Sequence, residues 1–171
     1  MGYAINTTAP SLRAVDSADD LLAGEVYQDQ IPTPWPPLPD LTTAIAAQIA
    51  EIDADCQATI YAGFTSSALG EAYSYPAKTK DQQNLTASVL DSVMPGISAT
   101  WTTPFWCESA AGEWAYVLHT AAQIQQVGQD GKVSILACMA KKQALEASIN
   151  ALATQDGATA ADAQAIVWVY P

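Results

Sequence analysis

The side chains most able to do chemistry in this chain of 171 residues are two adjacent serines, a single histidine and three cysteines. Ser66 and Ser67 stand in the segment Gly-Phe-Thr-Ser-Ser-Ala-Leu-Gly at positions 63–70, which lacks the Gly-x-Ser-x-Gly pattern of a hydrolase nucleophile. No Gly-Lys-Ser or Gly-Lys-Thr triplet occurs, so no phosphate-binding loop is predicted. Segment 63–70 is instead predicted to be a packed loop, because Phe64 and Leu69 are costly to leave in water.

His119 is the only histidine, and it stands where a predicted strand ends and a predicted helix begins. We expect its ring to bond to the backbone there, because one histidine cannot build a histidine-rich metal site. The cysteines are far apart and form no Cys-x-x-Cys pair, so they are predicted to be buried and reduced rather than zinc ligands. They are Cys56, Cys107 and Cys138. We therefore expect no metal, no cofactor and no catalytic residue, and a protein that is not an enzyme.

The charge composition argues against several classes of partner. The formal net charge is −12, most of it from acids within residues 1–77, and no basic patch is present. Binding to nucleic acid or to an anionic membrane is therefore not expected. The acidic half is expected either to bind a basic partner or to form a solvated surface that keeps the protein soluble. Only 14% of residues are charged, against roughly 25% in typical globular proteins, so a large contact would bury few charges and a homo-oligomer or a partner complex is expected.

Three segments are predicted along the chain. Residues 1–31 form a small β-containing module, with short strands and one helical turn capped by Ser17. Residues 32–39, with five prolines in eight positions, form an extended linker. Its Trp35 is expected to anchor the linker to the protein's own body or to a neighbouring subunit, and a Pro-rich peptide ligand is the alternative. Residues 40–171 form a helical domain with a β-hairpin.

The clearest helix runs from Asp40 as its N-cap to Gly63 as its stop. Its apolar residues fall on one narrow stripe flanked by alanines, which suits close packing either within the chain or in an oligomeric bundle. The stripe consists of Leu41, Ile45, Ile49, Ile52, Cys56 and Ile60. A second helix is predicted over residues 81–93. Its inward-facing residues are Leu85, Val89, Leu90 and Val93.

A β-hairpin rich in aromatic residues is predicted next. Its strands cover 99–107 and 113–118, and they are joined by a turn that contains Gly112. Because side chains alternate along a strand, Trp114 and Tyr116 are expected on one face of the second strand.

The last third of the chain is predicted to be mainly helical. Thr120 caps a short helix that ends near Gly128, and a turn follows at 130–131. A long helix is then expected over 132–154. Its apolar stripe is Val133, Leu136, Ala140, Leu145, Ile149 and Leu152. Residues 166–170 are β-branched and aromatic, so we expect a strand that pairs with an edge in this chain or in another.

The predicted fold is therefore α+β: a long-helix hairpin or bundle carries a β-hairpin, and a small β-containing module precedes it. Large apolar side chains of the loop, the hairpin and the two ends are the candidate contacts with a partner, since aromatic residues dominate interface energetics. These candidates are Trp35, Phe64, Leu69, Tyr75, Trp101, Trp106, Trp114 and Trp168.

Several strings in this order resemble a domain of unknown function in tail-fibre assembly and tail-fibre-associated proteins of temperate bacteriophages of Gram-negative bacteria. The similarity covers about residues 55–155. It rests on the segment at 63–70, Tyr75, Asp-Gln-Gln-Asn-Leu at 81–85, Trp-Cys at 106–107, Gly112, His-Thr-Ala-Ala-Gln-Ile at 119–124, Gly128, Asp130 and Gly131. Near the N-terminus, Arg-Ala-Val-Asp-Ser at 13–17 with Gly-Glu at 24–25 resembles a segment of related phage tail proteins, in which a tryptophan commonly stands at the position of Leu12.

The resemblance implies a non-enzymatic phage tail protein that binds the tail fibre or the baseplate. It would act as an assembly chaperone in the host cytoplasm, or as a small structural subunit of the fibre–baseplate region in the virion tail. The resemblance implies no small-molecule substrate and assigns no catalytic residue. A cytoplasmic location is also expected because no apolar stretch reaches membrane-spanning length and the first residues lack the basic start of a signal peptide.

Two alternatives stay open. One is a carbohydrate-binding receptor-recognition module of the phage tail, because five tryptophans can supply a sugar-stacking platform, although core and subunit packing explain them too. The other is a small polysaccharide hydrolase, which needs two carboxylates facing each other across a cleft. Asp53 and Asp55 do not suit that role, because residues two apart on a helix point to different faces.

Overall fold

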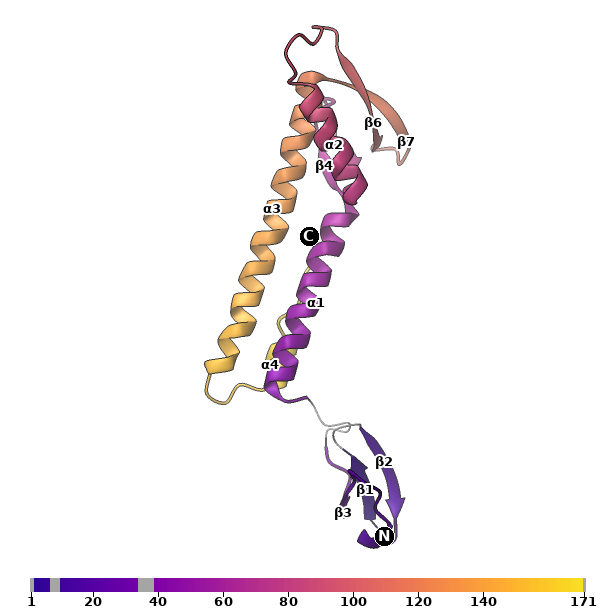
Figure 1. The fold of residues 1–171 in the computed structure, drawn as a ribbon, viewed down its shortest axis with the longest axis vertical. Coiled ribbons are helices and arrows are strands. Elements are labelled where there is room, and N and C mark those ends of the chain that lie inside the picture. The colour runs from indigo at the N-terminus through magenta and orange to yellow at the C-terminus, as the bar shows by residue number, and fades with distance from the viewer. Residues whose placement is uncertain (1, 7–9, 34–38, 171) are drawn as a thin grey trace.

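The computed structural model describes residues 2–6, 10–33 and 39–170, and its fold is α+β, as predicted (Figure 1). The strands are β1 (Gly2–Asn6), β2 (Ser11–Val15), β3 (Val26–Gln28), β4 (Phe64–Ser66), β5 (Tyr73–Tyr75), β6 (Thr102–Glu108) and β7 (Trp114–Thr120). The helices are α1 (Leu41–Ala62), α2 (Thr79–Asp91), α3 (Ala121–Ala151) and α4 (Ala160–Gln164), with 3-10 turns η1 (Ala18–Asp20) and η2 (Leu152–Thr154). Trp35 of the predicted linker lies outside the described residues.

The first sheet has the order β2–β1–β3, and Ala4 on its central strand is fully buried. Ser17 caps η1, as predicted. Arg13 on β2 reaches back to Glu25, just before β3. Its Nε and Nη2 atoms lie 3.1 and 2.7 Å from the two carboxylate oxygens of Glu25. This paired contact, the geometry that a guanidinium and a carboxylate favour, holds together the N-terminal segment that carries the resemblance.

α1 and α3 run antiparallel, side by side, and form the long hairpin of the fold (Figure 1). α1 begins after Asp40, whose Oδ1 accepts a hydrogen bond from the Thr43 N–H at 2.9 Å, and it ends at Gly63, both as predicted. Gly63 has a φ of 104°, and a Cβ there would lie 2.4 Å from the carbonyl oxygen of Tyr75. This glycine therefore ends the helix and also lets β5 approach. The side chains between the helices form the lower core: Ile52, Cys56, Cys138, Ile149 and Trp168.

The prediction of a break between 128 and 132 is wrong, because α3 is continuous from Ala121 to Ala151. Thr120 does cap it. The glycines serve close packing instead of chain reversal. A Cβ on Gly128 would lie 2.8 Å from Cγ2 of Val89 on α2, and one on Gly131 would lie 2.8 Å from Cζ of Phe64 on β4. Their lack of a side chain lets α2 and β4 sit directly on α3, and this packing stabilises a helix that two glycines would otherwise weaken.

α2 covers the first half of α3, and its predicted inner face is only partly right. Leu85 is buried and Val89 is half-buried, but Leu90 and Val93 are exposed. α2 ends at Asp91, so Val93 lies beyond the helix. Only one side of α2 faces α3 and the sheet, which leaves Leu90 in solvent (Figure 1).

The second sheet has the order β4–β5–β6–β7, and the predicted hairpin is confirmed as β6 and β7. The prediction of a loop over 63–70 is wrong for its first part, because Phe64–Ser66 forms β4 and pairs with β5. Phe64 is directly opposite Tyr75, and the two rings stack with centroids 5.5 Å apart. This cross-strand stacking favours an extended backbone. The sheet, α2 and α3 enclose the upper core: Tyr75, Leu85, Phe105, Cys107, Ile124 and Val127.

The prediction of a strand over 166–170 is also wrong, because these residues form no regular secondary structure. Trp168 enters the lower core, and the Lys141 ammonium lies 4.5 Å from its ring centroid. The Gln48 amide donates a hydrogen bond of 3.1 Å to the carbonyl oxygen of Ile166. The segment is therefore held by side chains of α1 and α3, and not by the backbone of a neighbouring strand.

Candidate interaction site on the β6–β7 hairpin

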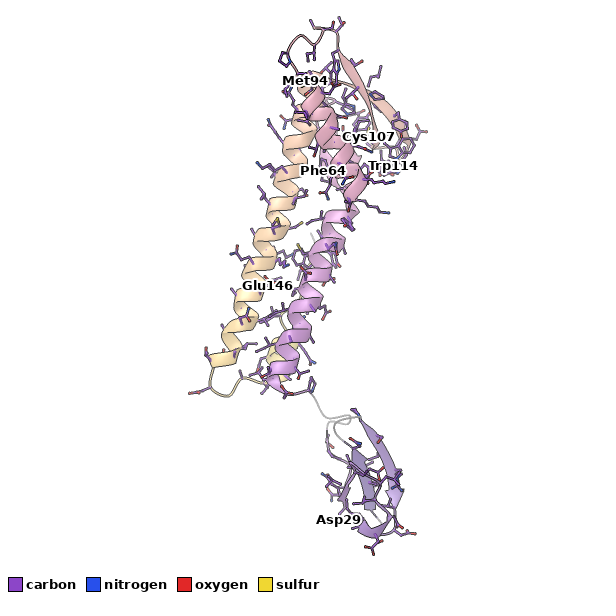
Figure 2. The ribbon with its side chains drawn as sticks, in the orientation of Figure 1. Asp29, Phe64, Met94, Cys107, Trp114 and Glu146 are labelled. Atoms are coloured by element: carbon purple, nitrogen blue, oxygen red, sulfur yellow. The ribbon has the colours of Figure 1, made fainter. Side chains whose placement is uncertain are left out.

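One face of the hairpin presents large apolar side chains to solvent. Trp106 is directly opposite Tyr116, with ring centroids 4.9 Å apart, and it stacks on Trp114 with centroids 6.0 Å apart and planes 20° from parallel. Trp106, Trp114 and Tyr116 are 40%, 42% and 72% exposed. Leu118, also exposed, continues this face along β7. We call Trp106, Trp114, Tyr116 and Leu118 the aromatic face; Figure 2 shows Trp114 near the free end of the hairpin.

The other face of the hairpin is tied to the upper core by His119, which is fully buried. Its Nδ1 lies 2.8 Å from the carbonyl oxygen of Val117, and its Nε2 lies 2.8 Å from the Tyr75 hydroxyl. Because a carbonyl only accepts, Nδ1 carries the proton and Nε2 accepts from Tyr75. Burial lowers the pKa of His119 and raises the pKa of Tyr75, so both side chains are neutral. The predicted backbone bond of His119 is confirmed, and the ring also links β7 to β5.

The hydroxyl-rich segment after α1 is locked to α3. The buried Ser66 hydroxyl donates a hydrogen bond of 2.5 Å to Oδ2 of Asp130 and accepts one of 3.2 Å from the Ala68 N–H. The other carboxylate oxygen of Asp130 accepts from Gln126 at 2.8 Å. Ser66 therefore uses its hydroxyl in structural bonds. Phe64, on the same strand, packs on Gly131, so β4 is fixed to α3 at two neighbouring points.

A hollow of about 490 Å³ adjoins the aromatic face, between the hairpin and α2. Trp106 and Tyr116 line one wall, and the other wall carries the polar side chains of Asp81, Asn84 and Ser88. Among the described residues, the side chains of Asn84 and Ser88 form no hydrogen bond, and Oδ2 of Asp81 accepts the Lys78 N–H at 3.1 Å. The hollow thus places free polar groups opposite flat aromatic rings.

The remaining candidate contacts do not join this face. Phe64, Leu69 and Trp101 are half-buried and pack against the upper core. Tyr75 is 1% exposed and Trp168 is buried in the lower core, so the expectation that these two face a partner is corrected. Their aromatic rings fill the interior of the chain itself. Of the predicted contacts, the structure brings Trp106 and Trp114 together.

Tyr116 and Leu118 belong to the aromatic face but are missing from the predicted contacts. The signal was available for Tyr116, because alternation placed it beside Trp114. The same alternation puts Leu118 on that face, but nothing local in the sequence shows which face of β7 is covered. The covered face is the one that carries His119. Because the His119 ring is buried, the even-numbered residues of β7 point outward.

The described residues offer no evident place for a metal ion: no group of three or more His, Cys, Asp or Glu side chains is gathered in them. The three cysteines are free and buried, as predicted. Burial raises the pKa of the Cys56 and Cys107 thiols, which disfavours the reactive thiolate. Across the same ranges, none of the helices combines the length and apolar character that crossing a bilayer requires.

No curated protein and no solved structure matches the chain. A match is found with a family described as a domain of unknown function, DUF4376. The matched residues are 43–167, which include nearly all of α1, the second sheet, the aromatic face and α3. The match covers most of the chain, which therefore belongs to the DUF4376 family.

Proposed function

We propose that this chain is a non-enzymatic phage tail protein that binds the tail fibre through its aromatic face. The exposed cluster of Trp106, Trp114 and Tyr116 is the observation that carries the binding proposal. The identity of the partner rests on the resemblance of segments 63–70 and 119–124 to tail-fibre assembly and tail-fibre-associated proteins. A baseplate protein next to the fibre is included in the proposal.

The aromatic face has the properties of a binding hot spot. Tryptophan and tyrosine are enriched among residues that dominate binding energy. Their side chains have few rotatable bonds, so little conformational entropy is lost on binding. Here the rings of Trp106, Trp114 and Tyr116 are already ordered by contact with one another. The bonds of His119 hold the hairpin from behind, so a partner meets a surface that is largely pre-organised.

β7 is an edge strand of the second sheet, because β6 is the one strand that pairs with it among the described residues. Its outer edge offers backbone groups to an extended segment of a partner, next to Tyr116 and Leu118. We therefore propose strand addition at β7 instead of at 166–170, where the sequence favoured it. Main-chain pairing would add affinity, and the aromatic face would supply selectivity.

The proposal has two forms with separate tests. An assembly chaperone acts in the host cytoplasm and raises the yield of soluble fibre. A small structural subunit of the fibre–baseplate region stays in the virion tail. Mass spectrometry of purified virions distinguishes them, because only the subunit persists in the particle in amounts comparable to the fibre.

The binding test is co-expression with the tail-fibre protein encoded beside this chain's gene. We expect co-purification, and at least about thirtyfold weaker binding for Trp106→Ala, since a hot-spot side chain contributes about 2 kcal/mol or more. Leu22→Ala, at an exposed leucine between η1 and β3, is the matched control and should bind as the native chain does. The absence of a complex, together with unchanged fibre solubility, would reject the proposal.

A carbohydrate-binding receptor module is the second candidate, and the hollow beside the aromatic face favours it. Sugars stack their apolar faces on rings such as Trp106 and Tyr116 while their hydroxyls bond to groups such as those of Asn84 and Ser88. A glycan array tests this candidate. Binding that is lost in both Trp106→Ala and Asn84→Ala supports it, and no binding to any glycan by the native chain counts against it.

A further inference from the structure

α3 carries a second apolar stripe that the other described residues leave uncovered. Ile149 and Cys138 face α1 in the lower core. Val133, Leu136 and Ala140, predicted to face the core, are exposed instead. Their spacing of three and four residues is that of a helix-pairing seam. A helix with apolar residues on two sides is typical of a buried position, and here the described part of the chain buries one side.

This stripe borders a long groove. One hollow of about 750 Å³ lies between α1 and α3, where Leu136 and Met139 are 51% and 54% exposed. A second hollow of about 680 Å³ lies between α2 and α3 and includes the exposed Leu90 and Val93. Gln82 lines both, so they adjoin. Together, the two hollows form the α3 groove, which runs beside α3 from Gln125 to Glu146, about 32 Å at 1.5 Å per residue.

The groove and the C-terminal segment lie on different flanks of α3. Lys141 and Leu145 contact the segment around Trp168 or the core beneath it. Met139 and Gln143 line the groove. At 100° per residue these two pairs point to opposite sides of the line from α3 to α1. The C-terminal segment therefore closes one flank of the hairpin and leaves the other open.

Charge points to the occupant. The chain carries a net charge of −12, so two copies repel each other over most of their surface. The charged side chains that line the groove are Asp53, Glu146, Lys132 and Lys142. Their two negative and two positive charges sum to zero. Lys142 already pairs with Asp53 and lies 3.8 Å from Glu146, whereas Lys132 forms no ion pair with any described residue. A second copy can thus approach along this strip without meeting excess like charge.

We propose that the α3 groove is the interface of a two-fold symmetric dimer, in which α3 of each copy lies in the groove of the other. An antiparallel pairing centred between Leu136 and Met139 sets each of these residues against the other in the second copy. The same register places Lys132 opposite Gln143, about one helical turn from Glu146 of the second copy. The two α1–α3 hairpins then form a four-helix arrangement that covers the exposed stripe of both copies.

The test is the mass of the full chain in solution by analytical ultracentrifugation. We expect a dimer at micromolar concentration and a monomer for Leu136→Glu, with an unchanged far-UV circular dichroism spectrum. Val169→Glu, at an exposed valine of the C-terminal segment, is the matched control and should stay dimeric. Leu136→Ser is the milder second variant and should weaken the dimer at least tenfold. A native chain that stays monomeric, or a trimer, would overturn the proposal.

Cysteine cross-linking tests the orientation. In the proposed register the two copies of residue 136 are about 4.5 Å apart along the helix axis, whereas those of residue 129 are about 25 Å apart. Leu136→Cys should therefore form an intersubunit disulfide under mild oxidation, and Gln129→Cys should not. The native cysteines are buried, so the native chain is the blank. A disulfide through position 129 would contradict the antiparallel pairing. None of the four residues of the aromatic face lines the groove, so these results do not depend on fibre binding.

Discussion

The upper and lower cores are built by different means. The upper core contains buried polar bonds between segments far apart in the sequence, Tyr75 to His119 and Ser66 to Asp130. The lower core around Ile52 is mainly apolar, and the segment 166–170, to which Gln48 donates one hydrogen bond, completes it. Directional bonds fix one arrangement, whereas apolar contacts tolerate small shifts. The aromatic face therefore stands on the end of the molecule whose core contains directional bonds, and the open groove runs on toward the end whose core is mainly apolar.

The largest expected effect tests whether the two cores contribute equally to the free energy of unfolding. Ile124→Ala in the upper core and Ile149→Ala in the lower core each remove a fully buried side chain. We expect each to lower the free energy of unfolding by about 2–5 kcal/mol. Urea unfolding followed by circular dichroism measures both. A much smaller loss for Ile149→Ala would mean that the lower core collapses around the cavity, which would sharpen the contrast.

The next effect concerns the hydrogen bond between Ser66 and Asp130 alone. Ser66→Ala removes the hydrogen bond to the Asp130 carboxylate and should cost about 1.5–3 kcal/mol, the range for bonds to charged groups. Ser67→Ala is the matched control: its side chain is exposed, so the change should stay within about 0.5 kcal/mol. Chemical denaturation of both variants gives the comparison. Equal stabilities would show that β4 is held by Phe64 without the serine.

Acid should weaken the upper core through His119. Burial lowers its pKa below the ordinary 6.5, so below that pH the unfolded chain binds more protons than the folded one. The stability contributed by neutral His119 is present above pH 6.5 and is lost as pH falls below it, by up to about 1.4 kcal/mol per pH unit. Urea unfolding between pH 7.5 and 5 measures this loss. His119→Gln should show a flatter profile, and an identical slope in both proteins would contradict the role.

The smallest effect belongs to the surface of the lower region. Lys142 pairs with Asp53, and the Asp53 side chain is largely exposed. Solvent screens such a pair, so Lys142→Met should change the free energy of unfolding by no more than about 1 kcal/mol. Thermal unfolding at low and high salt checks this. A larger, salt-dependent loss would mean that ion pairs, and not apolar contacts, hold α1 to α3.

Local signals in the sequence predicted much of the fold. Asp40 and Gly63 bound α1 because capping and helix termination are decided by one or two residues. The same holds for Thr120 at the start of α3 and for the alternating aromatics of β6 and β7. The α+β class follows from these elements.

The features that were not predicted depend on contacts between distant residues. Gly128 and Gly131 look like helix breakers, and only the nearness of Val89 and Phe64 explains them. Likewise the sequence alone suggests that Ser66 is a loop hydroxyl, and only the fold shows that it bonds to Asp130. The candidate site depends on which face of β7 is buried, and that is decided by an interior that no local pattern describes.

The unbroken course of α3 has a consequence for how the family can vary. Its 31 residues make a rod of about 46 Å that joins the hairpin to the turn before α4. Adding one residue near its middle would rotate everything above it by about 100° relative to α1. The aromatic face and the groove would then lose their fixed angular relation. Length changes in the middle of this helix should therefore occur in multiples close to a whole heptad, and single insertions should be confined to the turns.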